Sequence, residues 1–270
     1  MKLNIPAFVA ALAVLLSAAH AETVRLAVTT SFHNSGLSDT LLPAIQQELG
    51  IEVQLLVVGT GQALRLGRNG DVDALLVHSR DAEEQFVAEG FGVRRCELMY
   101  NDFVLIGPKD DPAGVAAAAS AAAALSAIAT FEKRFVSRGD DSGTHTRELH
   151  IWSLADLDPD EFGSWYSEVG AGMGASLNTA SALNAYILSD RASWLAFGNK
   201  GALALLYSGD AELHNQYAFL QVSQARHSHV KAELASRVER WLSGPRGGEL
   251  INGFRLQGES LFRHNASCNG

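Results

Sequence analysis

Short apolar, β-branched runs alternate with amphipathic segments along the first third of the chain. The run at residues 51–58 is almost continuously apolar, which is typical of a strand buried in a parallel sheet. Apolar residues at helical spacing over residues 37–49 predict a helix that ends at Gly50. The expected strands lie at residues 24–28, 51–58 and 73–78, and the expected helices at 37–49, 62–66 and 81–89. This alternation predicts an α/β fold with a mainly parallel sheet.

A second series of strands and helices begins after the turn signal at residues 108–112. Residues 113–130 are dense in Ala, the best helix former, and predict a helix, with a low-complexity linker as the alternative. Further strands are expected at 102–107, 135–137, 202–207 and 218–222, and further helices at 146–155, 230–242 and 248–254. The shift in composition near residue 107 predicts two lobes. Lobe I would contain residues 22–106 and 217–270, and lobe II residues 107–216.

Residues 1–21 have the pattern of a secretory signal peptide. Lys2 precedes an apolar run over residues 5–19, and Ala19-His20-Ala21 is a small-x-small cleavage site. We therefore expect cleavage near Ala21 and a periplasmic mature chain that begins at Glu22. No Cys stands at the cleavage point to carry a lipid. No later run reaches the ~20 apolar residues that a membrane span needs, so we expect no membrane insertion.

Charge and cysteine content exclude several classes of function. The 270-residue chain has a formal net charge of −9, which argues against nucleic-acid binding, because that binding depends on Lys and Arg neutralising phosphates. Net charge does not argue against a small anion, which contacts only local donors. The two cysteines, Cys96 and Cys268, lack a Cys-x-x-Cys spacing, and we expect neither thiol-redox activity nor a zinc site. Whether they pair is left open by their spacing.

Three loops share one design, at residues 29–36, 59–61 and 137–144. Each follows a predicted strand, is rich in Gly and hydroxyl side chains, and begins a helix. Helix N-termini offer unpaired N–H groups that suit an anion, and ligands of open α/β sheets lie beyond the carboxyl ends of strands. Arg138 adds a planar cation able to donate two hydrogen bonds to an oxoanion. Each loop taken alone also fits ordinary helix capping, so these patterns leave capping and anion binding open.

The same segments resemble the periplasmic tungstate-binding proteins of ABC importers, over essentially the whole mature chain. The matching segments are Thr29-Thr30-Ser31, Ser35-Gly36-Leu37, Val58-Gly59-Thr60-Gly61-Gln62-Ala63-Leu64, Met99-Tyr100-Asn101-Asp102-Phe103, residues 135–145 and Gly172-Met173-Gly174. The segment at 135–145 is the most specific, and its Arg138 with Ser142-Gly143-Thr144 also resembles the Arg-x-x-x-Ser-Gly-Thr anion loop of phosphate-binding proteins. The resemblance implies the type II periplasmic-binding-protein fold, an α/β fold of two lobes with the ligand in the cleft.

The resemblance also implies a set of ligand-binding residues and a mode of action. These residues are Thr30, Ser31 and Thr60 from lobe I, and Ser137, Arg138, Ser142, Gly143 (through its backbone) and Thr144 from lobe II. The ligand would be tungstate or molybdate held through its oxygens, with no cofactor, no metal ligated by side chains and no catalysis. The lobes would close on the anion, and the monomeric protein would dock on the membrane permease that works with an ATPase. We expect Arg138 to lie on an exposed loop of the open cleft.

Four residues near these loops qualify the resemblance. The family usually has an acidic residue where Asn34 stands and often Tyr where His33 stands; His33 either shapes the mouth of the site or is a solvated loop residue. Asp140 and Asp141 are unexpected beside an anion, and we expect them to hold Arg138 or to cap the next helix. If either faced the ligand, hydrogen phosphate, which carries a proton and gains from an acceptor, would become plausible.

Other functions remain to be weighed against oxoanion transport. Tungstate, molybdate and sulfate are fully deprotonated and need only donors, and the choice of tungstate rests on the resemblance alone. Ser142 and His145 suggest a secreted hydrolase, but no Gly-x-Ser-x-Gly elbow surrounds the serine. The nine His, including His227 and His229, form no cluster at metal-ligand spacing. The same fold could also serve a sensor in place of a transporter.

Overall fold

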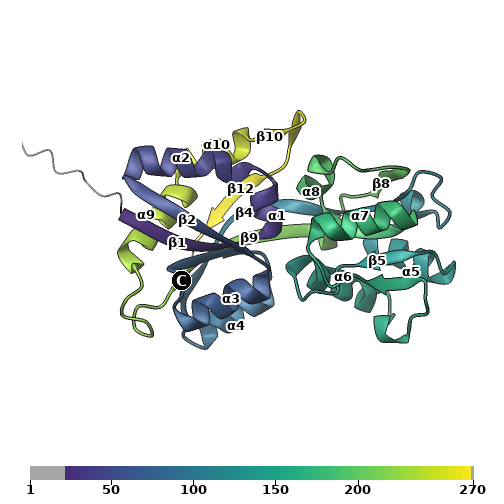
Figure 1. Ribbon diagram of the computed structural model, residues 1–270, viewed down its shortest axis with the longest axis horizontal. Helices are drawn as coiled ribbons and strands as arrows, with labels where there is room; N and C mark the ends of the chain where they lie inside the picture. The colour runs from purple at the N-terminus through teal and green to yellow at the C-terminus, as the bar shows by residue number, and fades with distance from the viewer. Residues whose placement is uncertain (1–21, 269–270) are drawn as a thin grey trace, which may run out of the picture.

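The computed structural model describes residues 22–268, so the predicted signal peptide lies outside the described residues. The described chain forms two bodies side by side, joined by extended strands (Figure 1). Within this part of the chain, no helix combines the length and the apolar character that a membrane crossing requires. The mixed α/β architecture predicted from the sequence is confirmed.

The first body is built on a six-stranded part of the sheet. Its strand order is β2 (Ile51–Val58), β1 (Glu22–Thr29), β3 (Ala74–Val77), β9 (His214–Val222), β4 (Gly92–Pro108) and β12 (Arg263–Ser267). One core packs this sheet against α2 (Leu37–Leu49), α9 (Ala232–Ser243) and α10 (Pro245–Gly253). A second core packs it against α3 (Thr60–Asn69) and α4 (Arg80–Ala88). Among the strands of the first body, only β2, β1 and β3 pair in parallel. In this body the predicted parallel sheet is therefore limited to these three strands.

The second body has the same layered design with a smaller sheet. The carboxyl-terminal part of β4 pairs with β7 (Tyr186–Asp190) and β8 (Leu203–Tyr207), and β5 (Phe135–Ser137) lies between β7 and β6 (Tyr166–Glu168). Two cores cover its faces, one with α5 (Ala121–Thr130) and α6 (Gly143–Leu154), the other with α7 (Met173–Leu183) and α8 (Arg191–Ala196). The remaining elements are α1 (Thr30–Asn34), the hairpin β10–β11 (Arg255–Leu256, Glu259–Ser260), and 3-10 turns at Val115–Ala117, Pro159–Glu161 and Ala211–Leu213.

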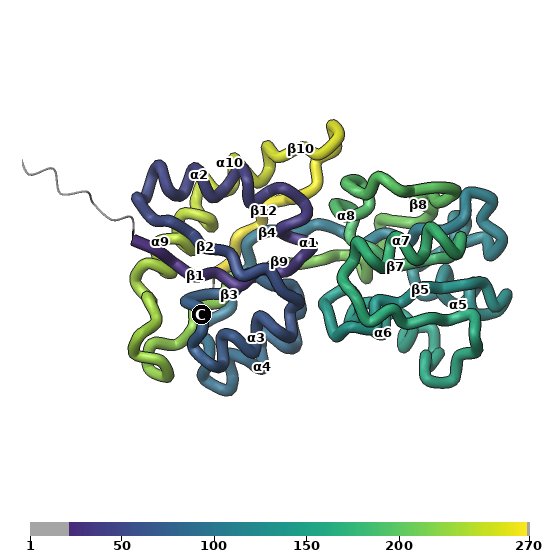
Figure 2. Tube along the Cα trace, viewed as in Figure 1, coloured from purple at the N-terminus to yellow at the C-terminus, as the bar shows by residue number. Residues whose placement is uncertain are grey.

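Two strands carry the chain between the bodies (Figure 2). The long strand β4 pairs with β9 as far as Asp102, which lies opposite His214, and with β7 from Phe103 onward. The chain therefore changes sheets between Asp102 and Phe103 and returns at the start of β9. These switches lie a few residues before positions 107 and 217, where the sequence predicts the lobe boundaries.

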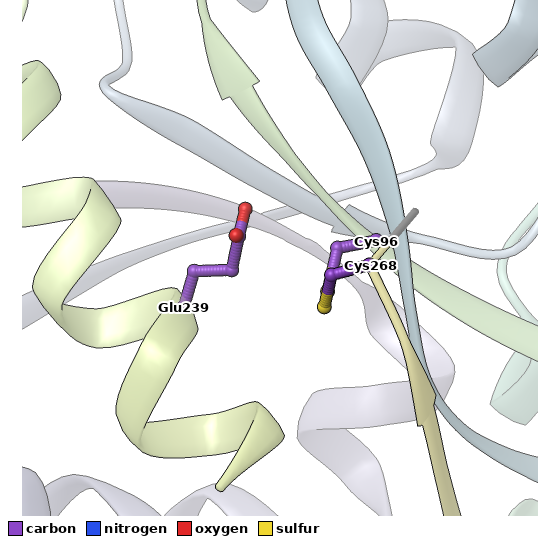
Figure 3. Close-up of side chains that lie close together, drawn as sticks. All are labelled: Cys96, Glu239 and Cys268. Carbon is purple, nitrogen blue, oxygen red and sulfur yellow. A yellow bond between two sulfur atoms is a disulfide. The ribbon is translucent and has the colours of Figure 1, made fainter. Parts of the chain in front are cut away.

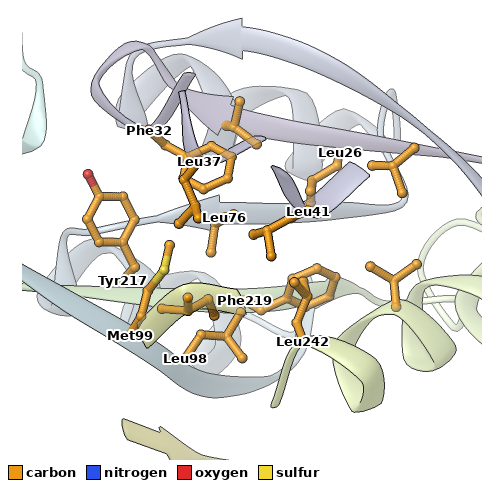
Figure 4. Close-up of a cluster of buried hydrophobic side chains, with 14 of the residues drawn as sticks. Leu26, Phe32, Leu37, Leu41, Leu76, Leu98, Met99, Tyr217, Phe219 and Leu242 are labelled. Atoms are coloured by element: carbon orange, nitrogen blue, oxygen red, sulfur yellow. The ribbon is translucent and has the colours of Figure 1, made fainter. Parts of the chain in front are cut away.

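The first body is closed around a cluster of large apolar side chains. Leu26, Leu37, Leu41 and Phe219 are among its buried members (Figure 4). The ring of Tyr217 belongs to the same cluster, while its hydroxyl points away from the aliphatic side chains (Figure 4). The cluster thus holds one polar group at its edge, near the end of β1.

Several elements differ from the sequence prediction. The Ala-rich segment is α-helical only from Ala121, where the side chain of Ser120 caps the helix by accepting from the N–H of Ala123 at 3.1 Å. Residues 92–101 extend β4 well before its predicted start, because both edges of this stretch, which mixes charged and apolar residues, pair with neighbours. The elements α7, β7, α8 and β12 were not predicted.

Cys96 and Cys268 form a disulfide that joins β4 to the end of β12, with their Cα atoms 4.0 Å apart. The sequence left this pairing open, and the antiparallel register of the two strands brings the residues together. Figure 3 shows Glu239 of α9 beside the pair. Its carboxylate is occupied by Arg94 and by the amide of Gln221 at 2.8 Å, and both sulfurs are bonded to each other. The three residues therefore do not form a metal site in this state.

Removal of the disulfide is expected to destabilise the first body. Its loop spans 172 residues of sequence, and the cross-link restricts the unfolded chain. We expect the double variant Cys96→Ala with Cys268→Ala to lose about 2–4 kcal/mol of unfolding free energy. Urea denaturation with and without a reductant measures this loss. With a reductant, the unfolding free energy of the wild-type protein should fall toward that of the variant. A variant as stable as the oxidised wild type would contradict the expectation.

Candidate functional site

The first half of the candidate site lies where β1 runs into α1. Thr29 caps this short helix, its Oγ1 accepting from the N–H of Phe32 at 3.3 Å. Thr30 is half-buried, and Ser31 is buried. Ser31 Oγ lies 3.1 Å from Thr29 Oγ1, 3.2 Å from the hydroxyl of Tyr217 and 3.3 Å from Nε2 of His78. Capping therefore explains Thr29, and it leaves Thr30 and Ser31 for another role.

Thr60 occupies the corresponding place on the next strand and helix. It is the first residue of α3, and the preceding Gly59 is the N-cap. Its Oγ1 is buried and has no hydrogen-bond partner among residues 22–268. A Cβ added to the neighbouring Gly61 would lie 3.9 Å from the carbonyl oxygen of Asp141. The start of α3 therefore faces the loop between β5 and α6.

That loop forms the second half of the site. Ser137 ends β5, and Ser142 caps α6 by accepting from the N–H of His145 at 3.3 Å. Arg138 is 4% exposed and forms an ion pair with Asp140, while its Nε donates to Ala171 O at 3.4 Å. The expectation of an exposed Arg138 is wrong, because the loop is enclosed where the two bodies meet.

The two aspartates of this loop have different roles. Asp140 holds Arg138 through one carboxylate oxygen, and its Oδ1 accepts from the N–H of Ser142 at 3.3 Å. The expectation that the aspartates hold Arg138 is confirmed for Asp140. Asp141 is exposed and has a left-handed backbone (φ 55°). The helix is capped by Ser142, where an aspartate was expected to cap it.

Within residues 22–268, three of the eight candidate residues carry a buried hydroxyl without a hydrogen bond of normal geometry, and of these Ser137 lies near Glu148 and Tyr166. Thr60 Oγ1, Ser137 Oγ and Thr144 Oγ1 have no hydrogen-bond partner of normal geometry within residues 22–268. Leaving a buried polar group unpaired costs about 1–3 kcal/mol. Groups of this kind from both halves of the site, together with a buried Arg, are the arrangement expected when a polar ligand completes the hydrogen bonds.

The two halves touch directly at Gly143 and His78. A Cβ on Gly143 would lie 2.5 Å from Cε1 and Nδ1 of His78 and 3.1 Å from its carbonyl oxygen. On the other side of the molecule, α1 and α8 lie side by side (Figures 1 and 2). The structure is therefore in a closed arrangement, with the loops that follow β1, β2, β3 and β5 gathered between the bodies.

His78 was not identified as a candidate from the sequence. It directly follows β3, and its ring centroid lies 4.8 Å from that of Tyr217. Burial, reinforced by the positive charge of Arg138, lowers the pKa of His78 to about 3, so the imidazole is neutral. Its position in the sequence could have indicated it. His78 is the last residue of a predicted strand, and the three candidate loops also begin where predicted strands end.

Two further groups at the site were also missed. Asn101 on β4 accepts from Asn215 at 2.7 Å, and its own Nδ2 is buried without a partner within the described residues. Asp190 caps α8 by accepting from the N–H of Ser193 at 2.8 Å, and its Oδ2 is likewise unpaired in that part of the chain. Burial raises the pKa of Asp190, and the nearby charge of Arg138 opposes this rise.

Comparison with known proteins identifies the family. The profile of the PBP superfamily domain matches residues 16–245. The chain is 40% identical to the tungstate-binding protein TupA of Peptoclostridium acidaminophilum, over 91% of this chain and 86% of that protein. It is 36% identical to the tungstate-binding protein TupA of Campylobacter jejuni, over 86% of this chain and 87% of that protein.

Two solved structures share both fold and sequence. The tungstate ABC transporter structure from Geobacter sulfurreducens superposes with a TM-score of 0.80 at 46% identity, covering 86% of this chain and 99% of that chain. The tungstate-binding protein TupA of Desulfovibrio alaskensis G20 superposes with a TM-score of 0.81 at 42% identity, covering 92% of this chain and 100% of that chain. The chain belongs to the tungstate-binding protein family of the PBP superfamily.

Membership of the tungstate-binding family confirms the resemblance and the fold predicted from the sequence. His33 and Asn34, the two positions where the sequence was expected to depart from the family, are both exposed. Asn34 lines a cleft between the bodies with Ser193 of α8. We therefore treat His33 as a solvated residue of the last turn of α1.

The hydrolase alternative is not supported by the geometry of Ser142 and His145. Ser142 Oγ accepts from the backbone N–H of His145, and the ring Nδ1 accepts from the N–H of Asp141 at 3.2 Å. The serine hydroxyl is therefore engaged in capping α6, while the imidazole is bonded elsewhere. A nucleophilic serine requires its hydroxyl on the base.

A buried carboxyl group supports α6 behind the site. Glu148 Oε1 accepts from Trp152 Nε1 at 3.1 Å and from the hydroxyl of Tyr166 at 2.8 Å. Burial raises the pKa of Glu148 to about 7, against these hydrogen bonds. The native protein therefore keeps a proton on Glu148 at pH values where the unfolded chain releases it.

We expect this proton to make stability depend on pH. Between about pH 4.5 and pH 7 the native state binds more protons than the unfolded state, so the free energy of unfolding falls as pH rises through this window. The loss is on the order of 3 kcal/mol. Urea denaturation at pH 5, 6, 7 and 8 measures the slope, which Glu148→Gln should flatten. The exposed Glu161→Gln is the matched control, and equal slopes in wild type and Glu148→Gln would refute the assignment.

Proposed function

We propose that this protein is the periplasmic solute-binding component of an ABC importer, which captures tungstate or molybdate and delivers it to the permease and its ATPase. The observation that carries the proposal is the set of buried hydroxyls from both bodies that are unpaired among residues 22–268, together with the buried cation of Arg138. The names of the relatives that match most of the chain support the choice of anion.

The proposed ligand-binding residues supply donors rather than acceptors. Thr30, Ser31 and Thr60 would contribute hydroxyls from lobe I, and Ser137 and Thr144 would do so from lobe II. The hydroxyl of Ser142 and the backbone N–H of Gly143 offer donors at the start of α6. Arg138 supplies the charge, held in place by Asp140. A fully deprotonated dianion needs such donors for its oxygen lone pairs, because its desolvation is costly.

The mechanism is clamping without covalent chemistry. We propose that β4 and the start of β9 form the hinge, because the chain changes sheets there. The anion would bind one lobe while the cleft is open, and the contact between Gly143 and His78 would form on closure. The closed monomer would then be the form that the permease recognises. The signal peptide would direct export and would be cleaved near Ala21.

A second candidate ligand is hydrogen phosphate, and one observation favours it. Asp190 Oδ2 is a buried acceptor, unpaired among the described residues, within the electrostatic reach of Arg138. An acceptor of this kind could take the proton that hydrogen phosphate carries. It would serve a tungstate site only if Asp190 were itself protonated, a state that its raised pKa favours.

Calorimetric titration of the purified mature protein tests the proposal. We expect saturable one-to-one binding of tungstate and molybdate, with sulfate and phosphate much weaker. Binding of phosphate alone would overturn the assignment of the anion and leave the fold untouched. Absence of binding for all four anions would overturn the proposed function.

A further inference from the structure

Ser31 has more polar neighbours than an isolated donor needs. A serine hydroxyl offers one proton and two lone pairs. Three groups lie within hydrogen-bonding distance of its oxygen: His78 Nε2, the Tyr217 hydroxyl and Thr29 Oγ1. Which of them donate decides whether Ser31 can accept a hydrogen bond from a ligand or only donate one.

The surroundings of His78 favour one position for its proton. The Nδ1 edge of the ring faces the backbone of Gly143, and Nδ1 has no hydrogen-bond partner of normal geometry within residues 22–268. A proton on Nδ1 would be a buried, unpaired N–H, which is costly. The side chain of Asn215 is a further hydrogen-bonding neighbour of the ring. A neutral ring with its single proton on Nε2 can donate it to Ser31 Oγ, and the proposal below rests on this tautomer.

Tyr217 can supply the second donor, and the side chains of Thr29 and Asn215 are its other hydrogen-bonding neighbours. Its ring is packed in the core of the first body, and its hydroxyl reaches Ser31 Oγ from β9 (Figure 4). Burial raises the pKa of Tyr217, so the phenol keeps its proton. When His78 and Tyr217 both donate, the two lone pairs of Ser31 are filled. The Ser31 proton can then go only to Thr29 Oγ1 or to a bound ligand.

We propose that His78, together with Tyr217, fixes Ser31 as a pure hydrogen-bond donor and thereby selects fully deprotonated oxoanions over hydrogen phosphate. His78 is a positioning residue, since it acts through Ser31. Hydrogen phosphate carries a P–OH group that needs an acceptor. Ser31 has none left to offer, so its donor role disfavours hydrogen phosphate unless another acceptor, such as Asp190 Oδ2, takes the proton. This inference rests on the proposed function, because it concerns the same site.

The selectivity of His78 variants tests the inference. His78→Leu removes the Nε2 donor and frees a lone pair on Ser31. Ser31 would then no longer be held as a donor toward the anion. Loss of that hydrogen bond from Ser31 to tungstate corresponds to about a tenfold loss of tungstate affinity. The affinity for hydrogen phosphate should not fall. The ratio of the tungstate association constant to the phosphate association constant should therefore fall about tenfold. His78→Gln, whose side-chain N–H groups can replace Nε2–H, should restore much of the ratio.

Controls separate this role from a structural one. His33→Leu changes an exposed histidine on α1 and should leave both affinities unchanged. Thermal unfolding establishes that each variant is folded. An equal fall in tungstate and phosphate affinity for His78→Leu, or a Gln variant no better than the Leu variant, would overturn the inference while the wild-type protein still bound tungstate. Failure of the wild-type protein to bind tungstate would instead overturn the proposed function.

Discussion

Replacement of Arg138 with Ala should weaken tungstate binding by about 30-fold to several thousand-fold, the range expected when one partner of a buried, hydrogen-bonded charge pair is truncated. Arg138 is almost fully enclosed, and it is the cation among the candidate binding residues. Arg138→Lys should fall between wild type and Ala, because an ammonium keeps the charge but loses the planar pair of N–H donors. Isothermal titration with tungstate measures all three proteins.

The enclosure of Arg138 also determines the controls. Removing its side chain leaves the carboxylate of Asp140 without its ion-pair partner, so some loss of stability is expected in the Ala variant and less in the Lys variant. Affinity must therefore be compared at a temperature where every variant is folded. Arg134→Ala alters an exposed arginine just before β5 and is the matched control. Unchanged tungstate affinity for Arg138→Ala would contradict the assignment of this loop to the binding site.

The contrast between Arg138 and His78 shows what the sequence can predict about this site. Arg138 stands in a local segment whose glycine and hydroxyl residues signal a strand, a tight loop and a helix N-terminus, and these signals need no distant residue. His78 depends on Ser31, 47 residues away, and on Tyr217, which lies 186 residues from Ser31. These contacts arise from the strand order β1, β3, β9, which periodicity does not encode.

The same distinction explains the predictions about the fold. The helix at Leu37–Leu49 was predicted with its correct ends, because apolar spacing and Gly50 are local signals. The long β4 was only partly predicted, because its first half mixes charged and apolar residues and becomes a strand by pairing with β9 and β12. The burial of Arg138 has the same cause. It follows from the approach of two bodies, and each loop read alone would be exposed.

Replacement of Gly143 with Ala is expected to prevent full closure of the cleft. The added methyl group would lie 2.5 Å from the ring of His78 and 3.1 Å from its carbonyl oxygen, and neither group can move freely, because His78 is buried against Tyr217. Overpacking of this kind costs about 1–3 kcal/mol, which corresponds to a loss of tungstate affinity of about 5- to 150-fold. Gly143 is the first residue of α6, a position where Ala is a good helix former, so each body should keep its own stability.

Two measurements distinguish a closure defect from a folding defect. Small-angle scattering should show the wild-type protein contracting when tungstate is added and the Gly143→Ala variant contracting less, while thermal unfolding without ligand stays close to wild type. Gly253→Ala is the matched control, since no atom lies within 4 Å of the Cβ it would add at the end of α10. If Gly143→Ala bound tungstate as tightly as wild type, the contact with His78 would not belong to the ligand-bound state. Arg138 and the hydroxyls of the two lobes would then have to hold the anion in a wider cleft, where fewer of its oxygens could be reached from both sides.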